Sequence, residues 1–139
     1  MFIIVMGVSG SGKSTIGKMV AERIGCAFYD GDDYHPPENV TKMAAGIPLT
    51  DADRVGWLDA LARLMQAEMD AGRDGVIACS ALKSSYRDAL RRGHRQEVKF
   101  AYLHGDFAVI LERMRRRQHF MKPEMLQSQF DTLEAPHDI

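Results

Sequence analysis

The segment GVSGSGKST, from Gly7 to Thr15, follows an apolar run at residues 2–6. Its glycines and its Lys-Ser pair have the spacing G-x-x-x-x-G-K-S, which is the Walker A phosphate-binding motif. Glycines let the backbone wrap closely around a phosphate, whose charge is met by successive N–H groups and by the positive end of the following helix. The apolar run and the helical pattern after the loop are the context that the motif requires. The segment therefore predicts nucleotide binding.

Two side chains of this loop have separate expected roles. We expect Lys13 to reach the β- and γ-phosphates of ATP, and the Ser14 hydroxyl to take one place on Mg²⁺. Binding of a nucleotide does not by itself establish phosphoryl transfer. The expected ATP-binding residues of the loop are Gly7, Val8, Ser9, Gly10, Ser11, Gly12, Lys13, Ser14 and Thr15.

A group of acids follows the second apolar run, in the segment YDGDDYHP. Asp30 and Asp32 would leave a parallel sheet at its carboxyl edge, beside the phosphate loop, where ligands of such sheets bind. One carboxylate there can hold the water shell of a metal while the other accepts the proton of an attacking hydroxyl. The alternative is an acidic turn whose aspartates cap the next segment, and this alternative is strongest for Asp33.

Other classes of nucleotide-binding protein lack support in the sequence. The guanine-specific motif Asn-Lys-x-Asp is absent, because the pair Asn-Lys never occurs in the chain. The third apolar run reads VIACSALK and contains no acid, whereas a typical Walker B strand ends in one. These observations favour a small-molecule kinase over a GTPase or a motor ATPase.

Strand and helix patterns alternate along the chain. Continuous apolar runs predict buried parallel strands at 2–6 and 75–79, and further strands are predicted at 27–30, which ends in acids, and at 98–103. Helical spacing and stop signals predict helices at 13–24, within 35–46, from 51 to Gly72, and at 84–92, 107–117 and 123–133. Thr50 and Asp53 have the spacing of a capping box at the start of the long helix. We therefore predict one α/β domain over residues 1–139, with a parallel sheet between two helical layers.

Composition and charge limit the kinds of partner. The formal net charge of −1 gives no electrostatic reason to expect nucleic acid or a membrane as partner of the whole molecule. Residues 83–122 carry an excess of Lys and Arg, which suits an anionic ligand or a solvated helix face. Cys26 and Cys79 each lie in an apolar run, where a buried and reduced thiol is expected. With no signal sequence and no membrane-spanning run, we expect a cytoplasmic protein.

Six segments of the chain resemble gluconokinases in order and spacing: MGVSGSGKS, DGDDYHP, NVTKMAAGIPLTDADRVGWL, CSALKSSYRDALR, YLHGDF and HFMKPEMLQSQFDTLEAP. Gluconokinases of this type are small P-loop kinases, similar in fold to shikimate kinase and the nucleoside monophosphate kinases. The resemblance runs from Ile4 to Pro136. It implies transfer of the γ-phosphoryl group of ATP to the 6-hydroxyl of D-gluconate, with Mg²⁺ as cofactor. The alternatives are another small-metabolite kinase such as shikimate kinase, a nucleotide-binding module without catalysis, or an anion binder that uses the arginines at 113–117.

The resemblance also implies roles for residues around the substrate, within a helical segment at about 34–72. By analogy with shikimate kinase, Asp32 would be the proton acceptor and Asp30 would lie on the metal side, with the reverse assignment still open. Gluconate has a carboxylate, so its pocket needs a cation, and Arg54 in the segment DADR is the first candidate. The alternative for Arg54 is a pairing with Asp51 or with solvent. His35 would hydrogen-bond the polyol, or would only mark a helix start.

Later segments supply the remaining candidates. Ser80 and the backbone that follows it would contact the substrate, and Lys83 would place a charge near the phosphates or would be an ordinary solvated lysine. The run 113–122 resembles a kinase lid, in which Arg117 would neutralise charge on the transferred group and Arg113 would lie near the adenine. The lid reads RRRQHFM where many gluconokinases have RKGHFM, so its closure is expected to differ.

The resemblance predicts an exposed sheet edge. Gluconokinases continue beyond the position of Ile139 with a fifth strand and a last helix, which here would be missing. Without them the strand at 98–103 becomes an edge strand, a feature that proteins usually cover. A partner chain could cover it, so a homodimer is one expectation.

Overall fold

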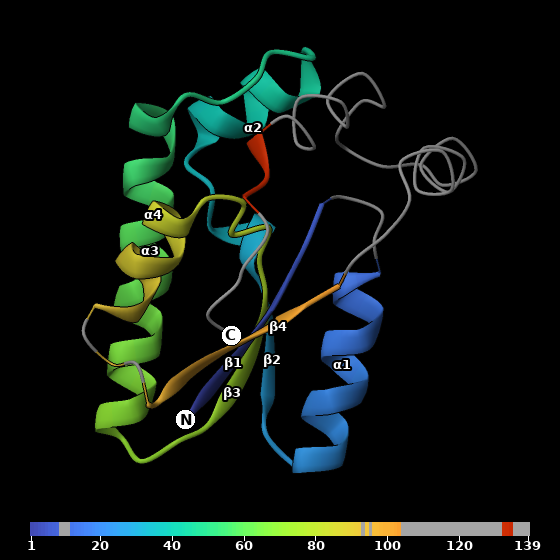
Figure 1. The fold of residues 1–139 in the computed structure, drawn as a ribbon, viewed down its shortest axis with the longest axis vertical. Coiled ribbons are helices and arrows are strands. Elements are labelled where there is room, and N and C mark those ends of the chain that lie inside the picture. Colours follow the sequence, from blue (N-terminus) through green and yellow to red (C-terminus); the bar gives the residue numbers. More distant parts are fainter. Residues whose placement is uncertain (9–11, 93, 95, 104–131, 135–139) are drawn as a thin grey trace.

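The computed structural model describes residues 1–8, 12–92, 94, 96–103 and 132–134 (Figure 1). Bounds predicted for the first strand, the first helix and the second strand are confirmed residue for residue, and later elements differ by one or two residues at their ends. The helix predicted at 107–117, the lid and almost all of the helix at 123–133 lie outside the described residues. The described elements are β1 (Phe2–Met6), α1 (Lys13–Ile24), β2 (Ala27–Asp30), the 3₁₀ turn η1 (Gly31–Tyr34), α2 (Pro37–Ala44), α3 (Asp51–Asp70), β3 (Gly75–Ala78), α4 (Ser84–Arg91) and β4 (Val98–Tyr102).

The four described strands form one parallel sheet in the order β2-β3-β1-β4. Helix α1 covers one face of the sheet, and α3 and α4 cover the other (Figure 1). This is the predicted three-layer arrangement. Among the described strands β4 pairs only with β1, so it is the edge strand that the sequence predicts.

Strand β1 contributes side chains to the core on both sides of the sheet. Phe2 and Ile4 are fully buried and pack in the cluster that includes Trp57 of α3. Val5 points to the other side, where it packs with Ala21 of α1. A strand with both faces buried needs apolar residues at successive positions, which explains why the continuous apolar run at 2–6 predicted it correctly.

The loops after β1, β2 and β3 meet at the carboxyl edge of the sheet. The Gly7 amide donates a hydrogen bond to the Ser80 carbonyl over 3.3 Å, which joins the phosphate loop to the loop after β3. Gly31 begins the turn after β2, and a Cβ on it would lie 2.6 Å from the Ala78 carbonyl oxygen. Only glycine therefore allows β2 to run into η1 this close to β3. The three loops that carry the predicted functional residues are held together at one edge.

Helix α3 begins with the predicted capping box. Thr50 Oγ1 accepts a hydrogen bond from the Asp53 amide over 3.1 Å, and Asp53 Oδ2 accepts one from the Thr50 amide over 2.9 Å. Lys42 of α2 also donates to Asp53, with Nζ 3.0 and 2.9 Å from its two carboxylate oxygens. The hydrogen bond from the Thr50 backbone, followed by that from Lys42, lowers the pKa of Asp53 to about 2. Asp53 thus links the start of α3 to α2.

We predict that Asp53→Asn lowers stability at neutral pH and that the difference from wild type narrows in acid. The pKa falls from an ordinary value of 3.8 to about 2 on folding. A carboxyl with a lowered folded-state pKa stabilises the fold above the unfolded-state pKa and loses this contribution as the pH falls through the folded-state value. Urea unfolding of both proteins from pH 7 down to pH 3 measures the gap. A gap that is constant over this range would contradict the prediction.

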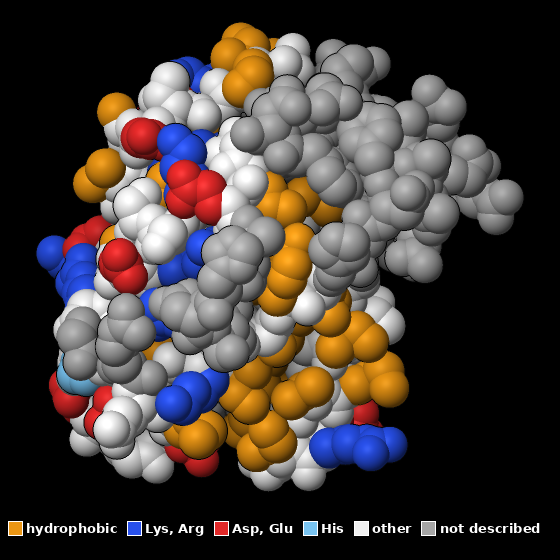
Figure 2. Space-filling model, in the orientation of Figure 1, with side chains coloured by type: hydrophobic (Ala, Val, Ile, Leu, Met, Phe, Trp, Pro, Cys, Tyr) orange, Lys and Arg blue, Asp and Glu red, His pale blue; other side chains and the backbone are white. Residues whose placement is uncertain are grey.

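Apolar side chains gather over α1 and beside the sheet in the view of Figure 2. On α1, Ile16, Met19 and Ile24 are each more than a third exposed.

Within the described ranges no helix is both long and apolar enough to cross a membrane.

Candidate active site

Lys13 lies at the start of α1 with its ammonium group turned back into the phosphate loop. Its Nζ donates a hydrogen bond to the Val8 carbonyl over 3.0 Å. Burial lowers the pKa of Lys13, and the charges of Asp32 and Asp30 act in the opposite direction. The predicted phosphate-binding lysine therefore lies within electrostatic reach of both predicted aspartates.

The two aspartates after β2 have different surroundings. Asp30 Oδ1 accepts a hydrogen bond from the Asp32 amide over 3.0 Å, so the residue that caps the turn η1 is Asp30, whereas the capping alternative was strongest for Asp33. The Asp32 side chain is 32 % exposed, which leaves it accessible to a ligand. Burial raises the pKa of Asp32 to about 6, against the opposing effect of the Lys13 charge. Asp33, the aspartate least expected to have a functional role, is exposed.

His35 is packed against α3. Its ring stacks on the Trp57 ring with a centroid distance of 4.1 Å, and Trp57 Nε1 donates to the Gly31 carbonyl over 2.8 Å. The His35 side chain is only 3 % exposed, and its Nε2 lies 3.9 Å from Asp32 Oδ1. Burial, followed by the charge of Arg54, lowers the pKa of His35 to about 4. At neutral pH the ring is therefore uncharged, and little of it is open to a substrate.

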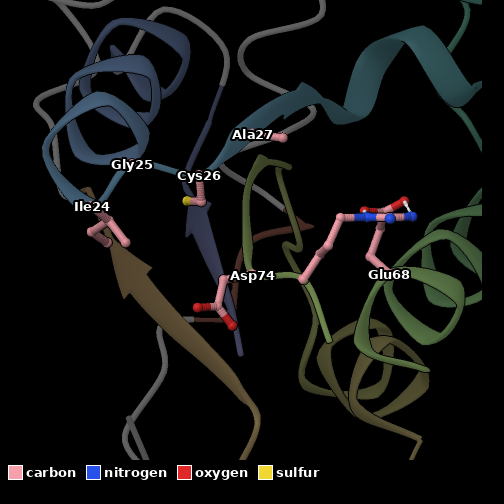
Figure 3. A pocket seen from close by; sticks show the side chains of 7 residues that line it. Ile24, Gly25, Cys26, Ala27, Glu68 and Asp74 are labelled. Carbon is pink, nitrogen blue, oxygen red and sulfur yellow. Dashed lines mark hydrogen bonds and ion pairs between the residues drawn. The ribbon is translucent and has the colours of Figure 1, made fainter. Parts of the chain in front are cut away.

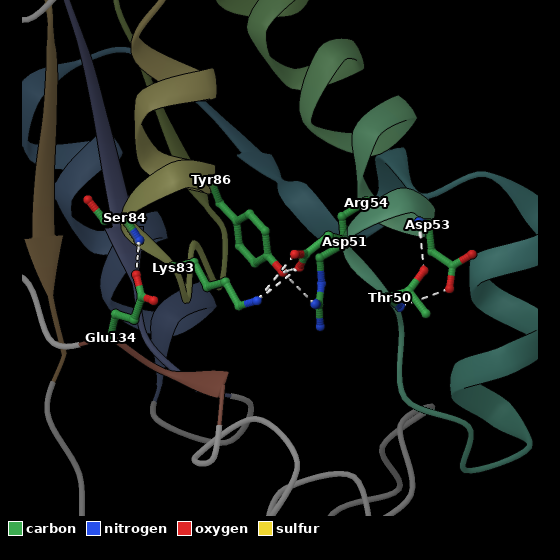
Figure 4. A network of polar contacts seen from close by, with 8 residues as sticks. All are labelled: Thr50, Asp51, Asp53, Arg54, Lys83, Ser84, Tyr86 and Glu134. Carbon is green, nitrogen blue, oxygen red and sulfur yellow. Dashed lines mark hydrogen bonds and ion pairs between the residues drawn. The ribbon is translucent and has the colours of Figure 1, made fainter.

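Arg54 belongs to a polar network between α3 and α4 (Figure 4). Its Nη1 donates a hydrogen bond to the Tyr86 hydroxyl over 2.8 Å, and that hydroxyl donates to Asp51. Lys83 Nζ lies 3.1 Å from the same Asp51 carboxylate, whose pKa is lowered by its hydrogen bonds from Tyr86 and Lys83. Tyr86 thus bridges Arg54 and Asp51, and the assignment of Arg54 to a substrate carboxylate stays a prediction.

The loop after β3 has most of its carbonyl groups engaged within the chain. Ala81 has a φ of 45°, in the left-handed region that only a few non-glycine residues adopt. The buried Arg87 supports this turn, with Nη1 2.8 Å from the Ala81 carbonyl and 3.3 Å from the Leu82 carbonyl. The Ser80 carbonyl accepts from the phosphate loop. The Ser80, Ala81 and Leu82 carbonyl groups thus have partners within the chain, and substrate contact through the backbone of this loop stays a prediction.

Two residues around the site were not assigned a role from the sequence. Tyr86 holds Arg54, and the buried Asn39 donates to His35. The spacing of four between His35 and Asn39 is no signal for their contact, because His35 is extended and precedes α2. Tyr86 carries no local signal either, because its partners lie more than thirty residues earlier in the chain.

A pocket of about 350 Å³ lies at the opposite, amino-terminal end of the strands (Figure 3). Its charged groups are paired within the chain: Arg73 Nε lies 2.6 Å from Glu68, and Asp74 lies 2.7 Å from the terminal amine. It is far from the phosphate loop and does not belong to the candidate active site. The pocket is lined by Ile24, Gly25, Cys26, Ala27, Glu68, Arg73 and Asp74.

The oxygen donors near Lys13 fit a nucleotide with Mg²⁺. In the part of the chain that the structure describes, no three His, Cys, Asp or Glu side chains come together as a cage for a metal ion. Mg²⁺ in kinases is held by one or two protein oxygens together with phosphate oxygens, so a full protein cage is not required. The Ser14 hydroxyl and the second carboxylate oxygen of Asp30 are donors of the type that Mg²⁺ prefers.

Comparisons with known proteins agree with this geometry. The shikimate kinase family model matches residues 9–135. The thermosensitive gluconokinase of Escherichia coli is 49% identical, with 96% of this chain and 71% of that protein aligned. The probable gluconokinase of Mus musculus is 46% identical, with 96% and 82% aligned.

The chain belongs to the gluconokinase family. A crystal structure of a gluconokinase from Sinorhizobium meliloti has a TM-score of 0.86 to this chain at 49% identity, covering 98% of this chain and 76% of that one. Membership of a kinase family establishes an enzyme that uses ATP. Several expected nucleotide-binding residues of this gluconokinase-family chain lie outside the described residues: Ser9, Gly10, Ser11, Arg113 and Arg117, together with the lid at 113–122.

Proposed function

We propose that the chain transfers the γ-phosphoryl group of ATP to the 6-hydroxyl of D-gluconate, giving 6-phospho-D-gluconate. The observation that carries the proposal is the set of charges around His35. Its Nε2 lies 3.9 Å from Asp32, and the charge of Arg54 acts on its ring. A proton acceptor and a cation thus both act on one side chain, and Asp32 is also within the electrostatic reach of the Walker A Lys13. A substrate that has both a hydroxyl and a carboxylate needs groups of these two kinds.

Each residue then has a definite task in the reaction. Asp32 accepts the proton of the 6-hydroxyl as its oxygen attacks the γ-phosphorus, and the bond from this phosphorus to the bridging oxygen of ADP breaks. Lys13 leaves the Val8 carbonyl and moves to the β- and γ-phosphates. Ser14 and Asp30 would hold Mg²⁺, which when bound offsets the negative charge of the phosphate oxygens. Arg117 and Arg113 are proposed to close over the nucleotide from the lid.

The substrate's carboxylate is assigned to Arg54. Its guanidinium group is held by the Tyr86 hydroxyl, and the Lys83 ammonium group lies on the same network (Figure 4). An arginine whose orientation is fixed before binding loses less entropy when it forms a bidentate pair with a carboxylate. Ser80 is proposed to line the path between the two ends of the substrate, whereas the His35 side chain, only 3 % exposed, offers the substrate little surface. We further propose that the enzyme acts in the cytoplasm, consistent with its two free cysteines.

Tyr86→Phe is expected to raise the KM for gluconate about tenfold, the value of one hydrogen bond to a charged group, with little change in the KM for ATP. The change removes the hydroxyl that positions Arg54 and keeps the buried ring. Tyr29→Phe is the matched control, because it removes a tyrosine hydroxyl that bonds Glu68 near the other end of the sheet. Steady-state kinetics with each substrate varied in turn measures both constants. Equal changes in the two KM values would show that Tyr86 does not act through the gluconate site.

The function is tested by incubating the chain with ATP, Mg²⁺ and one acceptor at a time, followed by mass spectrometry of the product. D-gluconate, shikimate and D-glucose form the decisive set, because glucose has the 6-hydroxyl and lacks the carboxylate. We expect phosphorylation of gluconate far above that of the other two. Preference for shikimate would support the alternative kinase, and ATP binding without any product would support a non-catalytic nucleotide-binding domain.

A further inference from the structure

Asn39 is a buried polar side chain to which the mechanism above gives no task. It is 3 % exposed, and its Nδ2 lies 2.8 Å from the Asp53 carbonyl oxygen and 3.2 Å from His35 Nδ1. A backbone carbonyl can only accept a hydrogen bond, so the atom facing it must be the amide nitrogen. That nitrogen has two N–H groups, one for each contact. His35 Nδ1 is therefore the acceptor from Asn39.

This contact determines where the proton of the His35 ring lies. A neutral imidazole has one N–H, and when Nδ1 accepts, the proton must be on Nε2. Stacking on Trp57, with an angle of 16° between the ring planes, fixes the direction in which the Nε2–H points. The carboxylate oxygen Oδ1 of Asp32 lies 3.9 Å from Nε2.

We propose that Asn39 and His35 form a positioning relay for Asp32: Asn39 holds His35 in the Nε2–H tautomer, and His35 donates this N–H to the Asp32 carboxylate in the substrate complex. The proposal rests on the proposed function insofar as Asp32 is the proton acceptor. Hydrogen bonds of catalytic groups are often long without ligand and shorten when the substrate binds, which accounts for the 3.9 Å separation. The task differs from the sequence-based expectation that His35 contacts the polyol.

Without the N–H donor of His35, the strongest partner of the Asp32 carboxylate would be Lys13. The ammonium group of Lys13 exerts the largest attractive effect on Asp32 among the described charges. A hydrogen bond from His35 would occupy one lone pair of the carboxylate and leave the other oxygen for the substrate hydroxyl. The relay thus gives Asp32 a second, directional partner besides the charge of Lys13.

The tautomer can be measured directly on the full chain without substrate. Ring ¹⁵N chemical shifts distinguish the Nε2–H from the Nδ1–H form, and the spectrum of His35→Gln identifies the signals of His35. We expect wild-type His35 to be in the Nε2–H form, and Asn39→Leu to weaken that preference because Nδ1 loses its donor. A wild-type ring in the Nδ1–H form would overturn the proposal.

The kinetics of two matched His35 variants test whether His35 donates an N–H to Asp32. His35→Leu and His35→Gln both lose the aromatic contact with Trp57, but the glutamine amide can place an N–H donor near the former position of Nε2. We expect kcat for gluconate to fall about tenfold in His35→Leu, the low end for a lost hydrogen bond to a charged group, and to recover largely in His35→Gln. Thermal unfolding of both variants checks that they are equally folded. Equal losses of kcat in the two variants would refute a donor role.

The ¹⁵N measurement and the kinetics of the His35 variants together separate this inference from the proposed function. A wild-type chain that fails to phosphorylate gluconate would refute the function. The tautomer measurement, which uses no substrate, would then decide on the Asn39–His35 contact alone. An Nε2–H ring together with rescue by glutamine is the result that supports the relay.

Discussion

Asp32→Asn is expected to lower kcat for gluconate phosphorylation on the order of 100-fold, with little change in the affinity for ATP. Asparagine keeps the shape of the side chain and can still accept a hydrogen bond from the substrate hydroxyl, but it cannot take its proton. The transition state of phosphoryl transfer needs positioning and charge stabilisation more than strong base catalysis, so the loss should lie at the low end of the range for general bases. ATP is held by the phosphate loop, which this change leaves intact.

The neighbouring Asp33 supplies the control for this experiment. Asp33→Asn removes the same charge from the same turn at an exposed position, and it should leave kcat near the wild-type value. Steady-state kinetics and calorimetric titration of ATP into each variant separate turnover from binding. If Asp32→Asn phosphorylated gluconate at the wild-type rate, the proton acceptor would be assigned wrongly, and Asp30→Asn would be the next variant to measure.

The sequence predicted the fold well where the signal is local. The strands at 2–6 and 27–30 and the helix at 13–24 were predicted residue for residue. The strand at 2–6 has the continuous apolar run that a buried parallel strand needs, and Gly25 ends the helix in a left-handed conformation. The strand at 27–30 is only partly buried, and it was predicted from a short run that ends in acids. The start of α3 was predicted from the spacing of Thr50 and Asp53 alone. The turn η1 was not predicted, since it depends on the close approach of Gly31 to β3.

The contacts of the site were harder to predict because they join distant elements. Arg54 was named from its position in the sequence, but its partner Tyr86 lies 32 residues later and meets it only when α3 and α4 pack together. Asp30 was expected near a metal, and the structure adds that one of its oxygens caps the turn that carries Asp32. Residue types and spacing thus identified candidates for the chemistry, whereas packing determines which side chain holds each of them in place.

Lys13→Met is expected to abolish most phosphoryl transfer, with kcat lowered at least about 100-fold, as found when one stabilising donor of a transition state is removed. Methionine has a similar length and flexibility but no charge, so the packing of the buried stem is largely kept. Two losses combine in this variant. The γ-phosphate loses its ammonium partner, and Asp32 loses the charge that holds its pKa down. Because burial already raises the pKa of Asp32 to about 6, a further rise would leave less ionised carboxylate at neutral pH.

Lys18→Met is the matched control, because Lys18 lies on the same helix and is exposed, with Nζ 5.8 Å from the centre of the Phe28 ring. It should keep nearly full activity. Product formation at saturating ATP and gluconate measures the effect, and circular dichroism checks that both variants are folded. Saturating ATP matters, because a lysine that only helped to bind the nucleotide would then show a normal kcat. A Lys13→Met variant with wild-type kcat under these conditions would therefore place the ammonium group outside the transition state and limit Lys13 to ground-state binding.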